Sequence, residues 1–301
     1  MYKSYPALNP ILVFLSGMFL MGEVAGSDFS SSMQESKAEL WQGWVDEYDE
    51  NRRSKEGWLS LAGLYWLTEG ENSLGSAKQN LHRFPEGTPP SFGTINTAGK
   101  QIEFVRNSEH VRIDGKDIDN QTLIPNETIV SLGSYSFYII ERETGFAVRL
   151  KNIENPSIAA FDGTHFYPYS QSWVVPARLV KHLGPQKISI ATVYGTVREN
   201  DSAGWLEFAY KGEKVRLQAV SYGPDTPMML MFADTTSRST TYGAGRFLDV
   251  EWPEEGDLTF LDFNRAYNPP CAITPFATCP LPPPQNRLKI SVEAGELFGG
   301  H

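Results

Sequence analysis

The sequence predicts a mainly β protein, an antiparallel sandwich or barrel-like fold that is α+β at the margin, with one amphipathic helix at its N-terminal end. Two observations carry this prediction. From Trp58 onward, short runs of β-branched and aromatic residues alternate with turns rich in Gly, Asn, Asp and Pro. Helical periodicity is largely confined to one stretch before that point, and many short strands with few helices favour a sandwich or barrel over a βαβ fold.

The predicted helix lies within residues 27–56. A serine cluster and Glu35 form a helix start. Apolar side chains then recur at three- and four-residue steps, which places them on one helix face: Leu40, Trp41, Trp44, Val45 and Tyr48. We expect the two Trp side chains at the centre of this face to dock the helix onto the rest of the protein.

Twelve later segments have the composition of strands. They are residues 101–105, 109–113, 128–132, 135–141, 145–150, 172–180, 187–194, 205–210, 213–220, 228–233, 258–262 and 287–293. Residues 57–301 are therefore expected to form one β domain or two packed subdomains, with a boundary near residues 168–176.

The first residues have the layout of a secretory signal peptide. A single early charge, Lys3, precedes an apolar run from Ile11 to Met21, and Val24-Ala25-Gly26 supplies small residues before a cleavage site. The run has about 11 residues, too few for the ~20 that span a bilayer. We predict that residues 1–26 are removed and that the mature protein is soluble and exported, periplasmic or secreted, without membrane contact.

Composition and missing motifs exclude several function classes. The chain has 26 Lys+Arg against 36 Asp+Glu, a net charge of −10, which argues against nucleic acid as a partner. The sequence contains no Gly-x-Ser-x-Gly elbow, phosphate-binding P-loop or complete dinucleotide loop. The 5 histidines are widely spaced and the 2 cysteines are too few for a thiolate site, so neither a metal nor a cofactor is predicted.

Residues 262–287 are the most distinctive part of the chain. Seven of the 20 prolines fall between residues 269 and 284, which excludes a central strand or a helix there. Prolines lower the entropy cost of holding a long loop in one shape, and polar side chains interleave with them. Together with residues 242–249, this segment is predicted to build a pocket. The candidate pocket residues are Tyr242, Arg246, Asp262, Asn264, Arg265, Tyr267, Asn268 and Asn286.

Each candidate side chain also has a structural interpretation. The arginines can pair with Asp249, Asp262 or loop carbonyls, and the asparagines can cap loop backbone groups. Cys271 and Cys279 leave three interpretations open. They form a disulfide in an oxidising compartment, they are two small buried side chains, or one of them is a nucleophile.

Several motifs carry a resemblance to a known family. They are Thr241-Tyr-Gly-Ala-Gly-Arg-Phe-Leu248, Asp262-Phe-Asn-Arg-Ala-Tyr-Asn-Pro-Pro-Cys-Ala, Thr274-Pro-Phe-Ala-Thr-Cys-Pro-Leu-Pro-Pro-Pro, Glu293-Ala-Gly-Glu296 and Gly57-Trp-Leu-Ser-Leu-Ala-Gly-Leu-Tyr-Trp-Leu. On these motifs the sequence resembles the bacterial and archaeal domain of unknown function DUF1684, over roughly residues 40–296. The resemblance implies no activity. One departure is Arg149-Leu-Lys-Asn152, where the family pattern tends to end in Asp.

A fainter likeness lies upstream. Trp66-Leu-Thr-Glu-Gly-Glu-Asn-Ser-Leu-Gly-Ser76, Ile113-Asp-Gly-Lys-Asp and Ser131-Leu-Gly-Ser-Tyr-Ser-Phe137 are similar in rhythm to forkhead-associated β-sandwich domains, which bind phosphothreonine. Ser76 stands where such domains usually place an arginine, so no binding residue is transferred.

Three functions follow from the predicted pocket. The first is a hydrolase-like enzyme acting on a small polar or anionic molecule, with no catalytic residue identified. The second is a non-catalytic envelope module that binds a peptide or a sugar. The third is a purely structural clasp that closes the C-terminus over the β domain.

Overall fold

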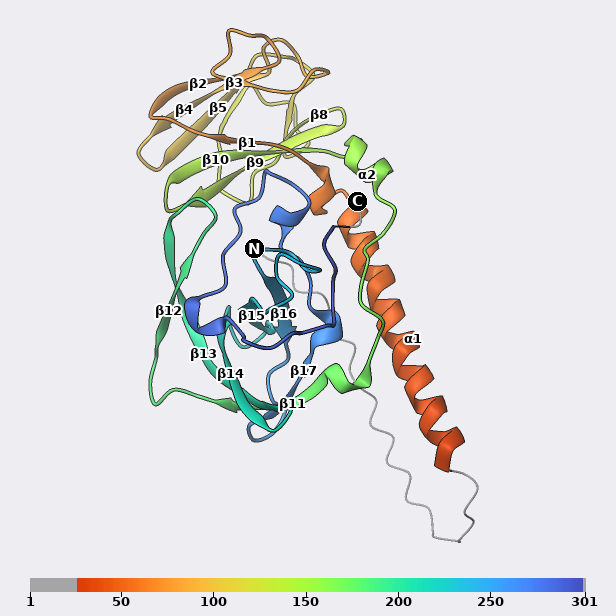
Figure 1. Ribbon diagram of the computed structural model, residues 1–301. Helices are drawn as coiled ribbons and strands as arrows, with labels where there is room; N and C mark the ends of the chain where they lie inside the picture. The colour runs from red at the N-terminus through yellow and green to blue at the C-terminus, as the bar shows by residue number, and fades with distance from the viewer. Residues whose placement is uncertain (1–25, 300–301) are drawn as a thin grey trace.

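The protein consists of one long helix and three largely antiparallel sheets. The computed structural model describes residues 26–299, with side chains described from Ser36 onward. Helix α1 (Gly26–Arg53) comes first, and residues 263–299, here called the C-terminal segment, come last and contain no strand. In Figure 1 two small sheets occupy one end of the molecule, the largest sheet occupies the other, and α1 runs along one side. The predicted fold class is confirmed.

Two five-stranded sheets form an N-terminal sandwich. The first has the order β1 (Leu61–Trp66), β10 (Gly145–Asn152), β9 (Tyr135–Arg142), β8 (Val130–Leu132), β6 (Arg112–Ile113). The second has the order β3 (His82–Arg83), β2 (Gly70–Gly75), β4 (Gly93–Ala98), β5 (Gln101–Arg106), β7 (Asn120–Thr122). Side chains from both sheets, among them Phe104 and Phe137, share one fully buried core. These two rings meet edge to face at 5.6 Å, a favourable aromatic geometry.

The third sheet contains seven strands and curls. It runs β16 (Arg246–Val250), β15 (Met228–Phe232), β14 (Glu213–Ser221), β13 (Val197–Tyr210), β11 (Val174–Val180), β17 (Leu258–Asp262), with β12 (Lys187–Ala191) paired to β13. β13 bends because its register shifts between Ser202 and Gly204. Gly204 has a φ of +134°, and a Cβ there would lie 2.6 Å from the Val180 carbonyl oxygen, so glycine is required.

Short helices connect the larger elements. The turn η1 (Trp58–Ser60) leads from α1 into β1, and α2 (Pro156–Ala160) and η2 (Gln171–Trp173) lie between β10 and β11. The C-terminal segment contains η3 (Phe263–Arg265), η4 (Pro270–Ala272) and η5 (Pro284–Asn286). A second core, formed under the third sheet and the C-terminal segment, is distinct from that of the sandwich. The division into subdomains and its boundaries stay a prediction.

Helix α1 docks through the predicted aromatic face. Trp44, Val45 and Tyr48 are buried and pack with Phe166 and Tyr267. At the end of the helix, Arg52 forms an ion pair of 2.9 Å with Glu296 of the C-terminal segment, and both side chains are 4% exposed.

The prediction that Leu40 shares the apolar face is wrong, because its side chain is 58% exposed, whereas the neighbouring Trp41 bonds to the Asn264 carbonyl and packs against Phe166.

The predicted strand at residues 287–293 is also wrong. This stretch belongs to no named strand, although Arg287 forms an isolated parallel bridge with Ala233, just after β15. Side chains hold the part that follows, since the Asp234 carboxylate accepts from the Val292 N–H at 2.7 Å and Arg246 donates to the carbonyls of Val292 and Ala294. Conversely, the structure contains strands that were not predicted, among them 61–66, 70–75, 93–98 and 246–250.

The predicted signal peptide, residues 1–26, lies outside the described residues except for Gly26. From residue 26 to residue 299, no helix combines the length and apolar character needed to cross a bilayer.

The Arg52–Glu296 ion pair generates a stability prediction. Arg52→Met should lower the free energy of unfolding by about 3 kcal/mol, because it leaves the Glu296 carboxylate buried without its cation. Urea unfolding measures this difference. The matched control is Lys187→Met, which breaks an exposed pair with Asp201 and should cost less than about 1 kcal/mol. Equal losses in the two variants would contradict the role of the buried pair.

Candidate functional site

Arg246 is one of the most deeply buried of the eight candidate residues. Its guanidinium pairs with the Asp234 carboxylate at 3.1 Å, and the two side chains are 1% and 0% exposed. It also donates to the carbonyl oxygens of Val292 and Ala294. Burial lowers the pKa of Arg246, and the charge of Asp234 opposes this shift. The arginine therefore holds the C-terminal segment against β16, and its partner is Asp234 rather than the acids expected from the sequence.

Asp262, Asn264 and Arg265 form a second group at the end of β17. Asn264 donates to the Asp262 carboxylate at 2.8 Å, and Arg265 lies 3.5 Å from the same carboxyl group. The Asn264 amide also exchanges two hydrogen bonds with the backbone of Ser170, at 2.9 and 3.0 Å. Burial raises the pKa of Asp262, whereas the hydrogen bonds from Asn264 and the charge of Arg265 lower it. This group fixes the start of the C-terminal segment to Ser170, the residue before η2 and β11.

Asn268, Asn286 and Tyr242 also bond within the protein. The Asn268 side chain donates to the Leu297 carbonyl at 2.9 Å, and its backbone N–H donates to Glu296 at 2.8 Å. Asn286 bonds to the backbone of Gln218, and Tyr242 donates to the Cys271 carbonyl at 3.3 Å. These side chains order the segment itself.

Tyr267 is bonded to a buried carboxylate, that of Asp249. Its hydroxyl donates to the Asp249 carboxylate at 3.2 Å, beside a small apolar cluster that includes Phe247. Burial raises the pKa of Asp249 to about 6, although the hydrogen bond from Tyr267 lowers it. A carboxyl group that titrates near neutrality is an acid–base candidate. From the sequence, Asp249 is expected only as a partner for arginine.

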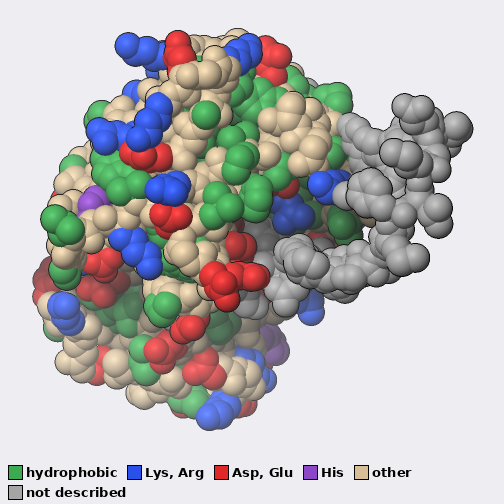
Figure 2. Space-filling view, turned by 90° about the horizontal axis from the view of Figure 1, so that it is seen from below, with side chains coloured by type: hydrophobic (Ala, Val, Ile, Leu, Met, Phe, Trp, Pro, Cys, Tyr) green, Lys and Arg blue, Asp and Glu red, His purple; other side chains and the backbone are tan. Residues whose placement is uncertain are grey.

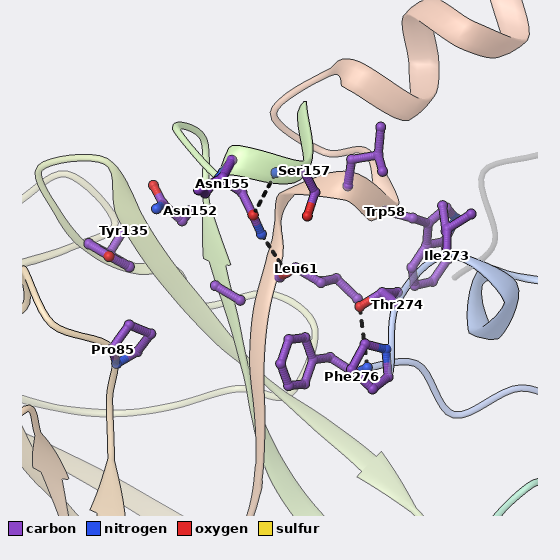
Figure 3. A pocket seen from close by; sticks show the side chains of 14 residues that line it. Trp58, Leu61, Pro85, Tyr135, Asn152, Asn155, Ser157, Ile273, Thr274 and Phe276 are labelled. Carbon is purple, nitrogen blue, oxygen red and sulfur yellow. Dashed lines mark hydrogen bonds between the residues drawn. The ribbon is translucent and has the colours of Figure 1, made fainter. Parts of the chain in front are cut away.

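A groove of about 290 Å³ lies where the sandwich meets the C-terminal segment. Figure 3 shows its lining side chains arriving from η1, β1, α2 and residues 273–276. The walls are mainly aromatic and apolar. They include Trp58, Leu61, Tyr135, Ile273, Pro275 and Phe276.

The polar groups of this groove are few and neutral. The Asn155 side chain is occupied, since it donates to the Leu61 carbonyl at 2.8 Å and accepts from Ser157 N–H at 3.1 Å. Asn152 accepts from Glu154 N–H at 3.0 Å, and its Nδ2 donates to none of the described residues. No acidic, basic or histidine side chain lines the groove.

None of the eight candidate residues lines this groove. The predicted segment does contribute to it, but through Ile273–Phe276, between the two cysteines. Two motifs in the sequence contain groove-lining residues, Thr274-Pro-Phe-Ala-Thr-Cys and Gly57-Trp-Leu-Ser, and both are also part of the family resemblance.

A second, more open hollow of about 470 Å³ lies at η2, the start of β11 and the end of β13, lined by Trp173 and Tyr210 among others. The eight candidates are absent from its lining too. Figure 2, which looks at the molecule from below, shows apolar side chains and charges of both signs intermixed over that end. Among residues 26–299, no group of three His, Cys, Asp or Glu side chains is placed to hold a metal ion.

Cys271 and Cys279 lie at disulfide distance. Their Cα atoms are 6.2 Å apart, within the range that a disulfide spans. The pair brackets the groove-lining residues 273–276. Of the three interpretations open from the sequence, this placement favours the disulfide.

Comparison with known proteins identifies the C-terminal part of the chain. Residues 159–297 match the family described as "Protein of unknown function (DUF1684)", so the chain carries a DUF1684 domain. This domain contains the whole third sheet and nearly all of the C-terminal segment. The resemblance over residues 40–158 stays a prediction.

Solved structures provide distant likenesses. An uncharacterized protein of Haloarcula marismortui, determined by solution NMR, has 29% identity, with 47% of this chain and 80% of that chain covered and a TM-score of 0.40. Two FHA domains have 16% identity over 29% of this chain, each with a TM-score of 0.22. The first comes from a study of phosphothreonine-dependent FHA domain interactions, and 81% of that chain is covered. The second is the FhaA FHA domain, and 86% of that chain is covered. No curated protein matches the sequence. These likenesses transfer neither a site nor an activity.

The raised pKa of Asp249 generates a pH prediction. The pKa rises from 3.8 in the unfolded chain to about 6 in the folded protein, so the folded state binds more protons between these values. Stability is therefore lost as the pH rises through this window. Asp249→Asn should remove that loss and increase the free energy of unfolding at pH 8 by about 2 kcal/mol, with no gain at pH 4.

Urea unfolding at a series of pH values measures this effect. Glu213→Gln, at an exposed position of the same sheet, is the control and should give no such pH-dependent gain. A pH-independent difference for Asp249→Asn would show that the carboxyl group is not destabilised by burial.

The cysteine pair generates a separate prediction. Non-reducing mass spectrometry of the protein should give a mass about 2 Da below that of the dithiol form, because a disulfide has lost two hydrogens. The double variant Cys271→Ala, Cys279→Ala should lose about 2.5 kcal/mol of stability, the loop-entropy value for so short a ring. Wild-type protein treated with reductant is the control. Two free thiols in the untreated protein would contradict the pairing.

Proposed function

We propose that this protein is an exported, non-catalytic binding module that holds a peptide in the groove beside the C-terminal segment. The observation that carries the proposal is the chemistry of the groove: aromatic and proline walls, one unoccupied amide donor at Asn152, and no acidic, basic or histidine side chain. Apolar walls with few polar groups are typical of binding sites. Acid–base and nucleophilic catalysis need titratable groups within reach of the ligand, and this groove offers no base to activate the Ser157 hydroxyl.

The size of the groove favours a peptide side chain over a larger ligand. Its volume of about 290 Å³ is at the lower limit of small-molecule sites, and suits one or two apolar side chains of an extended peptide. A sugar would present many hydroxyl groups to these mainly apolar walls, and the few polar side chains, among them Asn152 and Ser157, could satisfy only some of them. The Asn152 amide is instead suited to one peptide carbonyl.

Rigidity supports the same function. Pro275 and the cysteine pair restrict the loop that forms one wall, and Asn155 caps α2 on the opposite side. A site that is already ordered loses little entropy when a ligand binds. Export is part of the proposal because the N-terminal sequence has signal-peptide layout and a cysteine pair at disulfide distance suits an oxidising compartment.

A second function, a hydrolase-like enzyme acting on a small polar molecule, is favoured by one observation. Asp249 has a pKa of about 6 and accepts a hydrogen bond from Tyr267, an arrangement suited to a general base. We place it second because Asp249 lines neither of the two hollows described above.

A groove-filling variant tests the binding function. The probes are tetrapeptides with Leu, Phe or Glu at a central position, followed by the NMR signal of the Trp58 indole N–H. The Leu and Phe peptides should shift this signal and the Glu peptide should not, because the walls are apolar. Ser157→Trp should weaken binding by about tenfold or more, because it fills the groove from α2.

The matched control is Ala160→Trp, an exposed position on α2 that does not line the groove, and it should bind as wild type does. A Trp58→Phe variant assigns the indole signal. Binding that Ser157→Trp leaves unchanged, or no shift with any peptide, would refute the proposal.

A further inference from the structure

Arg149 on β10 differs from the other buried cations of the described residues. The others each face a carboxylate: Arg52 faces Glu296, Arg246 faces Asp234, and Lys151 faces Glu56. Arg149 is equally buried, at 4% exposure, and takes part in no ion pair. A buried charge without a counter-charge is unfavourable, so this position calls for an anion.

The contacts of Arg149 leave most of its donors unused. It makes one long hydrogen bond, 3.4 Å to the hydroxyl oxygen of Thr278, and its guanidinium lies 5.6 Å from the centre of the Trp58 ring. Its Nε is buried and has no hydrogen-bond partner. The residues directly across the sheet are Leu64 and Tyr138, and neither carries a negative charge at neutral pH. The strands therefore supply no counter-charge.

A second guanidinium meets Arg149 at the same oxygen. Arg142 on β9 donates from Nε to the Thr278 hydroxyl at 2.9 Å. Two positive groups thus converge on one neutral oxygen. Arg142 and Thr278 are only half-buried, so the position can be reached from their side.

We propose that Arg149 and Arg142, with the hydroxyl of Thr278, form a binding site for a small oxyanion, a phosphate or carboxylate group. A guanidinium presents parallel N–H donors that match the two oxygens of either group, and the bond strengthens where water is excluded. The unpartnered Nε of Arg149 and its neighbouring donors supply one such edge. The site lies under the loop closed by Cys271 and Cys279, and the anion links this loop to the sandwich.

This site does not depend on the peptide groove being occupied. The two sites share Trp58, which lines the groove and also stacks with Arg149. No charged side chain lines the groove, whereas the anion site is defined by the charges of Arg142 and Arg149. The groove residues Ile273 and Phe276 make no polar contact in the anion site. Each can therefore fail independently of the other.

Thermal unfolding of the full chain in different salts tests the proposal. The probes are inorganic phosphate and acetate, compared with chloride at the same ionic strength. A probe that binds should raise Tm by about 5 °C at a concentration roughly 100 times its Kd. Arg149→Met should abolish this shift. In chloride alone Arg149→Met should be at least as stable as wild type, because it removes a buried charge that has no counter-charge and whose Nε makes no hydrogen bond.

Arg178→Met is the matched control, because Arg178 is an exposed arginine of β11 and its loss should leave the shift unchanged. A response to phosphate alone identifies a phosphate site, a response to acetate alone a carboxylate site, and a response to both a general oxyanion site. No response of the wild type, or an equal response of Arg149→Met, overturns the proposal.

Arg149→Lys provides a second measurement if the methionine variant does not fold. Phosphate is titrated while the tryptophan fluorescence is followed, since Trp58 stacks with Arg149. The variant keeps the charge but loses the paired donors, so its phosphate affinity should be about tenfold weaker. An affinity equal to that of the wild type overturns the proposal.

Discussion

The buried ion pair between Arg246 and Asp234 is the interaction on which the C-terminal half of the structure depends. Both groups bond to the backbone of one residue, since Asp234 accepts from the Val292 N–H at 2.7 Å and Arg246 donates to the Val292 carbonyl at 2.9 Å. A buried pair is stable only when its remaining donors and acceptors are satisfied. Here the backbone of the C-terminal segment supplies these hydrogen-bond partners. The pair and the segment therefore stabilise each other, and neither would be ordered in this way alone.

The position of Val292 determines what Glu296 can reach. Four residues further along the segment, the Glu296 carboxylate accepts from Tyr48 at 3.0 Å and from Arg52 at 2.9 Å, both on α1. The same carboxylate accepts from the Asn268 N–H at 2.8 Å. The helix, the third sheet and the C-terminal segment are thus joined through two buried carboxylates. This arrangement explains why α1, a helix with one apolar face, packs on the half of the molecule that is most distant from it in sequence.

Much of the fold could be predicted because local pattern and final environment agree. The strands at 135–141 and 145–150 were found from their alternating side chains, and the structure extends them by only one or two residues. β2 and β4 were missed because Gly70–Gly75 and Gly93–Ala98 are rich in glycine and polar residues. Their strand conformation comes from pairing with each other, which is a non-local effect. Residues 287–293 were wrongly predicted as a strand, because their backbone pairing ends after a few bonds to residues 233–235, and the Asp234 side chain bonds to Val292 instead.

The candidate site stays a prediction, but its polar residues all bond within the protein, for a reason that lies in the proline content of the segment. A segment with many prolines lacks backbone donors, so its own structure must be held by side chains. Asn286 shows this, since its amide bonds to both backbone groups of Gln218 and to the Met231 carbonyl, between β14 and β15.

The polar residues that look most available for a ligand in the sequence are those the segment needs for its own order. The groups that this internal bonding does not use are the apolar wall at Phe276 and the hydroxyl of Thr278 beside an arginine without a counter-charge, and these are the groups on which the two proposed sites rest.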